Sequence, residues 1–368
     1  MSRRLYLRPT AFVDAPFGLD GQALRLAGGM IWFSAVEIII VEDGRRALQL
    51  HVPIERLEHE LERLDRAERT QAEETLARIV TPRSPIMMGD RVIRLDQPQV
   101  MAILNVTPDS FSDGGRHFDD AEAAAAAGIA MAAAGAAIID VGGESTRPGA
   151  KPVWEGDEIK RVAPVIERLA GSGTAVSIDT RKSEVMVIAL ASGAAFVNDV
   201  SALTYDPHAM SVVARANCPV ALMHHQGSPE SMQADPRYAD PLIEVYDWLE
   251  ARIATAEAAG IARDRIIIDP GIGFGKAMAH NLALLNGLSL FHGLGCPVLL
   301  GASRKRVIGA LDNEAPVEKR LGGSVALALI GAAQGVQILR VHDVQETVQA
   351  LRVWRGMRDQ ALTPPYGI

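Results

Sequence analysis

From residue 100 to the end of the chain, short runs of β-branched and aliphatic residues alternate with longer stretches whose apolar residues recur at helical spacing. The short runs predict buried strands, because the strands of parallel sheets are covered on both faces. The predicted strands are 100–105, 137–141, 176–179, 196–200, 220–223, 266–269, 298–301 and 337–341. The predicted helices are 121–134, 158–169, 183–191, 207–216, 242–259, 282–290, 321–333 and 344–354.

This alternation of strands and helices indicates a parallel sheet with right-handed crossovers. Eight such units in about 270 residues match a closed (β/α)8 barrel. A doubly wound open sheet is the structural alternative, but it would carry a glycine-rich phosphate-binding turn after its first strand, and this sequence has none there. The predicted fold class is therefore α/β, a (β/α)8 barrel.

Residues 1–85 have a different composition and predict an N-terminal α+β extension. A strand-like run at 30–41 is followed by a single charged amphipathic helix predicted at 54–80, with Leu57, Leu61, Leu64 and Ala67 at helical spacing. The breaker cluster at 81–85 marks the boundary, so residues 86–368 form the second domain. We expect the extension to be a packing or oligomer-stabilising appendage; a regulatory or partner-binding module is the alternative.

The formal net charge of −8 and the pI near 5.6 argue against a general nucleic-acid-binding protein, which needs a basic surface. Cys218 and Cys296 each precede a proline in an apolar run and are interpreted as buried thiols of a reducing compartment. The basic N-terminus lacks the apolar segment of a signal peptide, and no stretch is suited to span a bilayer. We expect a cytoplasmic protein with neither nucleic-acid nor membrane partners.

Nearly every predicted strand of the barrel ends in polar residues, where barrels carry their chemistry. Asp179, Asn198 and Asp269 would converge on one mouth. Carboxylates only accept hydrogen bonds, so this set suits a flat heterocycle with an N–C–N donor edge. A Mg²⁺ site is the competing interpretation, because carboxylates also bind that ion.

A second group of strand-end residues brings donors and positive charge together in this acidic chain. Its members are Asn105, Lys305, Arg340 and His342. They suit a phosphate or diphosphate, which barrels often hold at the loops after strands seven and eight. For Arg340 and Lys305 taken alone, a structural ion pair is the alternative.

These strand ends resemble the signatures of the dihydropteroate synthase family. The first, Ile-Leu-Asn-Val-Thr-Pro-Asp-Ser-Phe-Ser-Asp-Gly-Gly, occupies 103–115, and the second, Asp-Val-Gly-Gly-Glu-Ser-Thr-Arg-Pro-Gly, occupies 140–149. Shorter matching segments follow in the family's order at 177–180, 198–199, 223–227, 269–276, 303–305 and 340–343. The similarity runs from about residue 91 to residue 355 and leaves the extension outside it.

The resemblance implies a pterin-binding TIM barrel and a transferase of folate biosynthesis. Its substrates would be 6-hydroxymethyl-7,8-dihydropterin diphosphate and 4-aminobenzoate, and its products 7,8-dihydropteroate and diphosphate. Mg²⁺ would assist the loss of diphosphate, and the amine would attack a pterin cation. Sulfonamide drugs would compete for the aminobenzoate site, and the chain would form a homodimer through its last helices.

The resemblance also implies the following site residues. The pterin would be held by Asp179, Asn198, Met223, Asp269, Phe274 and Lys305. The diphosphate would be held by Asn105, Arg147, Arg340 and His342, with Mg²⁺ at Asn105. The 4-aminobenzoate would be framed by Phe111, Thr146, Pro148 and Ser303. The catalytic residues would be Asp179, Lys305, Arg340 and His342.

The sequence departs from the family pattern at two places. Ala102 replaces a usual glycine, and Ala277-Met278-Ala279 stands where the family has Thr-x-Glu, so a hydroxyl and a carboxylate are missing near the pterin mouth. This second departure and the extension keep open a non-catalytic pterin-binding paralogue or scaffold. A methyltetrahydrofolate-dependent methyltransferase of the same superfamily is a further alternative, although it would need neither the 110–113 loop nor the anion-binding group.

Overall fold

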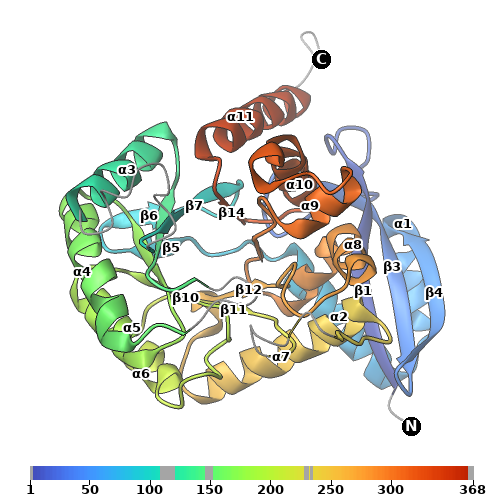
Figure 1. Ribbon diagram of the computed structural model, residues 1–368. Coiled ribbons are helices and arrows are strands. Elements are labelled where there is room, and N and C mark those ends of the chain that lie inside the picture. Colours follow the sequence, from blue (N-terminus) through green and yellow to red (C-terminus); the bar gives the residue numbers. More distant parts are fainter. Residues whose placement is uncertain (1–2, 108–120, 146–151, 228–231, 233–234, 364–368) are drawn as a thin grey trace.

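The computed structural model describes residues 3–107, 121–145, 152–227, 232 and 235–363, and its central feature is a ring of parallel strands (Figure 1). The neighbours run in the order β12-β11-β10-β9-β8-β7-β14-β13, and a parallel bridge from Ile268 to Val298 joins the two ends. The strands are β7 (Gln99–Asn105), β8 (Ile138–Gly142), β9 (Val176–Asp179), β10 (Phe196–Asp199), β11 (Val220–Met223), β12 (Ile266–Asp269), β13 (Leu299–Leu300) and β14 (Ile338–Val341). The predicted (β/α)8 barrel is confirmed.

Helices surround this ring on the outside, as Figure 1 shows. They are α3 (Ala121–Ala134), α4 (Glu155–Gly171), α5 (Ser183–Ala191), α6 (Ala209–Ala216), α7 (Pro241–Ala258), α8 (Met278–Asn286), α9 (Arg306–Leu311), α10 (Leu321–Ala333) and α11 (Val344–Ala361). The short helix α9 was not predicted. The stretch expected as one helix at 282–290 is divided at Gly287 between α8 and the 3-10 helix η3 (Leu288–Leu294).

The N-terminal mouth of the barrel is closed by a hairpin of β5 (Ile86–Met88) and β6 (Arg91–Ile93). Ile86, Met88 and Ile93 share one buried cluster with Met101 and Phe196, which belong to barrel strands. Burial of these side chains from water stabilises the plug. The strands end in polar residues at the opposite mouth, which is the mouth where barrel enzymes carry their active sites.

The extension forms an antiparallel sheet that lies between two helices and the barrel wall (Figure 1). It consists of β1 (Arg3–Val13), β2 (Leu24–Arg25), β3 (Trp32–Glu42), β4 (Arg45–Pro53), α1 (Ile54–Glu62) and α2 (Arg66–Val80). Because side chains alternate across a strand, Tyr6 and Ile39 join the barrel core, while Leu5, Leu7 and Ile38 pack in a second core. The division of the chain at residue 85 remains a prediction.

The single helix predicted at 54–80 is wrong, because the chain leaves the helix between α1 and α2. Asp65 begins α2 by accepting a hydrogen bond of 2.9 Å from the backbone N–H of Glu68, whose side chain returns to the N–H of Asp65. This reciprocal arrangement is a capping box. It gives the second helix a start of its own in the middle of a continuous apolar pattern.

None of the described helices is both long and apolar enough to cross a bilayer. Cys218 and Cys296 are both buried and unpaired, as the sequence predicted.

Candidate active site

The predicted site residues that the structure describes lie at the carboxyl ends of the barrel strands. Asp179 ends β9, Met223 ends β11 and Asp269 ends β12. The others occupy equivalent places: Asn105 on β7, Asn198 on β10, Arg340 on β14, Phe274 after β12, Ser303 and Lys305 after β13, and His342 after β14. Since the ring is closed, these ends surround one mouth.

The guanidinium of Arg340 is the centre of an ion-pair cluster in this mouth. Its Nε donates to Oδ2 of Asp140 at 2.6 Å, and its Nη2 donates to Oδ2 of Asp179 at 2.5 Å. Asp140 also accepts from Asn198 Nδ2 at 2.9 Å and from Ser177 Oγ at 2.6 Å. Asp179, Asn198 and Arg340 are therefore brought together, as predicted, through a carboxylate that received no role in the sequence analysis.

Asp140 is the main residue that sequence reasoning missed. It is fully buried and begins the second signature segment at 140–149. Its position near the end of a predicted strand was the available signal. Nothing in the sequence shows that Arg340, 200 residues later, needs two carboxylates rather than one.

One oxygen of Asp179 is left without a partner. Its Oδ1 is buried and accepts no hydrogen bond from the described residues. Burial raises the pKa of Asp179, an effect that the nearby Arg340 opposes. Because a buried acceptor without a donor is unfavourable, this atom is suited to accept an N–H from a ligand.

Asp269 and Lys305 lie close together on the other side of the mouth. A side-chain carbon at Gly301 would lie 3.7 Å from Asp269 Oδ2 and 4.0 Å from Lys305 Nζ, so glycine keeps the space beside both groups clear. Asp269 Oδ1 accepts the backbone N–H of Gly271 at 2.7 Å. Burial raises the pKa of Asp269 and lowers that of Lys305 to about 8, and each charge opposes the shift of the other.

An apolar border accompanies this polar pair. The ammonium of Lys305 lies over the ring of Phe274, 4.5 Å from its centroid, and donates to the carbonyl oxygen of Ile272. Met223 is buried at the end of β11. Lys305 is thus placed next to a flat apolar surface that a heterocycle could share.

Ser303 and His342 form a further pair at the last two strands. The Ser303 hydroxyl accepts the backbone N–H of His342 at 3.2 Å and lies 3.1 Å from its Nδ1. Asn105 faces the acidic side instead, because a carbon placed on Gly142 would lie 3.5 Å from Asn105 Oδ1 and 3.8 Å from Asp179 Oδ2.

Four predicted site residues lie outside the described residues, and the structure gives no position for them. They are Phe111, Thr146, Arg147 and Pro148.

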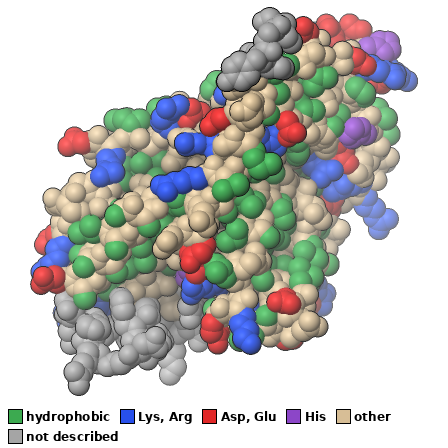
Figure 2. All heavy atoms as spheres, turned by 90° about the horizontal axis from the view of Figure 1, so that it is seen from above, with side chains coloured by type: hydrophobic (Ala, Val, Ile, Leu, Met, Phe, Trp, Pro, Cys, Tyr) green, Lys and Arg blue, Asp and Glu red, His purple; other side chains and the backbone are tan. Residues whose placement is uncertain are grey.

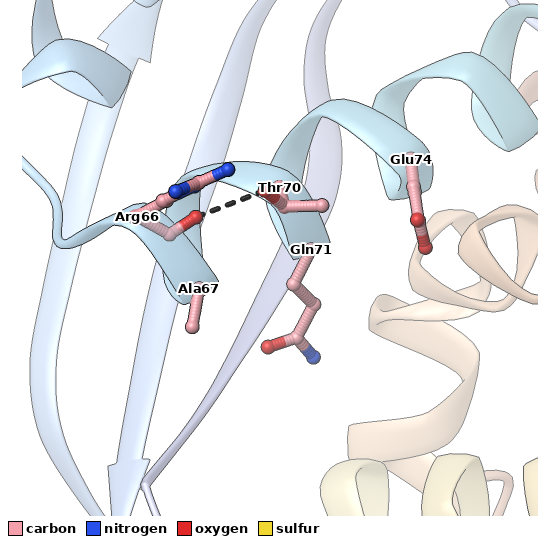
Figure 3. A pocket seen from close by; sticks show the side chains of 5 residues that line it. All are labelled: Arg66, Ala67, Thr70, Gln71 and Glu74. Atoms are coloured by element: carbon pink, nitrogen blue, oxygen red, sulfur yellow. Dashed lines mark hydrogen bonds between the residues drawn. The ribbon is translucent and has the colours of Figure 1, made fainter.

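A separate depression is found on the extension, along α2. It is lined by Arg66, Ala67, Thr70, Gln71 and Glu74, and the Thr70 hydroxyl donates to the Arg66 carbonyl at 2.9 Å (Figure 3). These side chains belong to consecutive turns of one helix and include none of the strand-end residues. The depression is therefore distinct from the barrel mouth.

Comparison with known proteins agrees with this geometry. Residues 101–342 match the family described as "Pterin binding enzyme". The dihydropteroate synthase of Escherichia coli K12 is 50% identical over 260 residues, which cover 70% of this chain and 91% of that protein. The extension precedes the matched family region.

Solved structures show the same relationship. The dihydropteroate synthase of Xanthomonas albilineans, solved with 4-aminobenzoic acid, has a TM-score of 0.71 and 48% identity, covering 76% of this chain and 100% of that one. The Yersinia pestis enzyme, solved as a sulfonamide drug complex, has a TM-score of 0.71 and 44% identity, covering 75% and 99%. The chain therefore belongs to the pterin-binding enzymes and, within them, to the dihydropteroate synthase family.

Proposed function

We propose that this chain joins 6-hydroxymethyl-7,8-dihydropterin diphosphate to 4-aminobenzoate, giving 7,8-dihydropteroate and diphosphate. The observation that carries the proposal is the Arg340 cluster with Asp140 and Asp179, set in the same mouth as the Asp269 and Lys305 pair. One side of the mouth offers acceptors for a donor-rich ring, and both sides carry cations that suit an anionic leaving group.

The pterin would lie between Asp179 and Asp269, with Asn198 beside the first. The aminopyrimidine edge of a pterin presents N–H donors, which carboxylate oxygens accept. The buried Oδ1 of Asp179 has no donor among the described residues and would receive one. Lys305 would donate to the ring carbonyl, while Phe274 and Met223 border the slot.

The diphosphate would lie near Arg340, His342 and Asn105, with Arg147 as a further cation outside the described residues. A guanidinium carries five N–H donors, so Arg340 keeps donors for a phosphate oxygen while it holds both carboxylates. The 4-aminobenzoate would be framed by Ser303 together with Phe111, Thr146 and Pro148.

A Mg²⁺ ion fits this arrangement. Mg²⁺ prefers oxygen ligands, keeps several waters and is commonly held by one or two protein oxygens with substrate phosphates. Asn105 offers an amide oxygen, and Asn105 Oδ1 and Asp179 Oδ2 would lie 3.5 and 3.8 Å from a side-chain carbon placed on Gly142. No group of three or more His, Cys, Asp or Glu side chains in the described part of the chain is placed to hold a metal. Asn105 would hold the ion, which when bound offsets negative charge on diphosphate.

The reaction then follows from charge placement. The bond between the methylene carbon and the diphosphate oxygen breaks, and its electron pair leaves with the diphosphate. Arg340 and His342 would stabilise that negative charge, while the Asp179 carboxylate would stabilise the positive charge spread into the pterin. The neutral amine attacks the methylene carbon and releases a proton, so no strong general base is required.

Incubation of the purified protein with the pterin diphosphate, 4-aminobenzoate and Mg²⁺ tests the proposal. We expect 7,8-dihydropteroate and diphosphate in equal amounts. When 4-aminobenzoate is omitted, we expect no 7,8-dihydropteroate. Folded protein that binds pterin but forms no product would instead support a non-catalytic paralogue. Methyl transfer from methyltetrahydrofolate would support the methyltransferase alternative.

Two further parts of the proposal concern assembly and location. Leu321 and Ile330 of α10 and Val353 and Met357 of α11 are 38–71% exposed, and hydrophobic side chains are visible on the face of the molecule drawn in Figure 2. A second copy of this chain would cover them, giving a homodimer.

The buried, unpaired thiols of Cys218 and Cys296 suit a reducing compartment, so we propose that the protein is cytoplasmic.

A further inference from the structure

The loop between β12 and α8 borders the predicted pterin slot and has an unusual backbone. Gly271, Gly273 and Gly275 have φ values of 67°, 84° and 63°, which favour glycine. A side-chain carbon at Gly271 would lie 1.9 Å from the carbonyl oxygen of His224, and one at Gly275 would lie 2.2 Å from that of Gln226. The loop therefore packs closely against the segment that follows β11.

Lys276 holds this loop from inside. Its ammonium Nζ lies 2.9 Å from the carbonyl oxygen of Gly271, 3.0 Å from that of Phe274 and 3.3 Å from that of His224. It also lies 2.9 Å from His224 Nδ1. Lys276 is 2% exposed, so water does not compete for these contacts.

The partners of Lys276 are dipoles and not charges. Within the described residues, Lys276 forms no salt bridge with a carboxylate. Burial, and secondarily the charge of Lys276, lower the pKa of His224 to about 2, so its imidazole is neutral at physiological pH and accepts through Nδ1. Burial lowers the pKa of Lys276. Its N–H groups are shared among three carbonyl oxygens and one ring nitrogen, and this set of contacts fixes the path of the loop.

Other side chains secure the remaining backbone groups of the same loop. Tyr238 donates its hydroxyl to the Gly275 carbonyl at 2.9 Å, and Asn281 Oδ1 accepts the Gly273 N–H at 2.7 Å. Lys305 donates to the Ile272 carbonyl. Lys305 also lies over Phe274 beside Asp269, which gives it a ligand-facing position that the deeper Lys276 does not have.

We propose that Lys276 is a positioning residue for the pterin: it fixes the Phe274 ring and the Gly271 N–H that holds Asp269, so that Lys305 remains available to the substrate. The proposal rests on the function proposed above. It assigns the two lysines different tasks, since Lys276 organises the loop and Lys305 meets the ligand.

The first test replaces Lys276 by methionine, which keeps the length of the side chain and removes the ammonium. We expect Lys276→Met to raise the KM for the pterin diphosphate by about tenfold or more and to leave the KM for 4-aminobenzoate within about twofold. Calorimetry with 6-hydroxymethylpterin should show a similar loss of affinity. The matched control is Lys319→Met, on an exposed lysine of the 3-10 helix η4 (Val317–Lys319), which should change neither KM.

A second pair of variants decides the matter if Lys276→Met does not fold. His224→Asn retains an acceptor near the position of Nδ1, and His224→Leu removes it. We expect His224→Leu to weaken pterin binding by about tenfold and His224→Asn to recover most of that loss. Equal loss in both variants would overturn the proposal.

Two other results would also overturn it. One is an equal rise in both KM values for Lys276→Met, and the other is a lowered Tm with unchanged pterin affinity. Failure of the proposed function has a different signature, because wild-type protein would then form no dihydropteroate. The calorimetric comparison would still decide whether Lys276 positions the pterin.

Discussion

The hydroxyl group of Tyr6 donates a hydrogen bond of 2.8 Å to Oδ1 of Asp247, which joins the first strand of the chain to α7 of the barrel. The Tyr6 ring also meets Tyr246 edge to face, with centroids 5.3 Å apart. Arg4 adds a salt bridge of 2.9 Å to Asp247. The extension is therefore built into the wall of the barrel, and the packing role expected from the sequence is the one that these contacts favour.

Replacing Ile39 by alanine should destabilise the whole protein. Ile39 is fully buried in the cluster that contains the barrel strands, so Ile39→Ala should lower the free energy of unfolding by about 2–5 kcal/mol. Leu48→Ala, on a side chain that is 45% exposed on β4, is the control and should change it by about 0.5 kcal/mol or less. Urea unfolding measures both. Equal small effects would mean that the extension is dispensable for stability.

Removing the guanidinium of Arg340 should lower turnover. We expect Arg340→Ala to lower kcat by about 100-fold or more, because a preorganised cation for the leaving diphosphate is lost. Arg69→Ala, on an exposed arginine of α2 that pairs with Glu73, is the control and should leave kcat unchanged. Comparable turnover in Arg340→Ala would reject its assigned role.

Removing the carboxylate of Asp140, a buried partner of Arg340, should lower the stability of the protein. Asp140 is fully buried, and Asp140→Ala leaves Arg340 with one carboxylate and removes the acceptor of Asn198 Nδ2 and the nearer acceptor of Ser177 Oγ. We expect a loss of about 3–5 kcal/mol in the free energy of unfolding. Asp157→Ala, which breaks an exposed pair with Lys160, should cost about 1 kcal/mol or less. Denaturant unfolding compares the two variants.

The pH dependence of kcat/KM should be bell-shaped. Burial lowers the pKa of Lys305 to about 8, so its ammonium loses its proton as the pH rises through that value and activity falls. Burial raises the pKa of Asp179, so protonation of its carboxylate lowers activity as the pH falls. Lys305→Arg keeps the positive charge at alkaline pH and should remove the alkaline limb. An unchanged alkaline limb in this variant would assign it to another group.

Chelation of Mg²⁺ should lower turnover without changing the thermal stability of the protein. With EDTA we expect turnover to fall by about tenfold or more, because the charge on diphosphate is no longer offset. The Tm should not change, since no cluster of three or more His, Cys, Asp or Glu residues in the described ranges is placed to hold a structural ion. A drop in Tm with EDTA would show that the metal also stabilises the fold.

The barrel was predictable because its information is local. Strands 176–179, 220–223 and 266–269 were predicted with the bounds that the structure has, since buried parallel strands are short apolar runs between helical patterns. The strand-end position of Asp179 and Asp269 could also be predicted from the sequence. The alternation of strands and helices makes the strands parallel, so their carboxyl ends meet at the mouth that carries the active site.

The extension was predicted less completely. Its strand at 30–41 was found within two residues of β3, but β1 and β4 were not expected, and α1 and α2 were taken as one helix. The capping box of Asp65 and Glu68 was visible in the sequence, yet a continuous apolar pattern outweighed it.

The sequence by itself determined the order of strands and helices and the kinds of side chain at each strand end, because apolar spacing and motif order lie along the chain. Only the tertiary structure decided that Arg340 is shared by Asp140 and Asp179, that Lys276 binds backbone carbonyl oxygens, and that β1 and β3 pack against the barrel. These choices depend on distances between groups far apart in sequence. Burial then gives each pairing its strength, because water no longer competes for the charged groups.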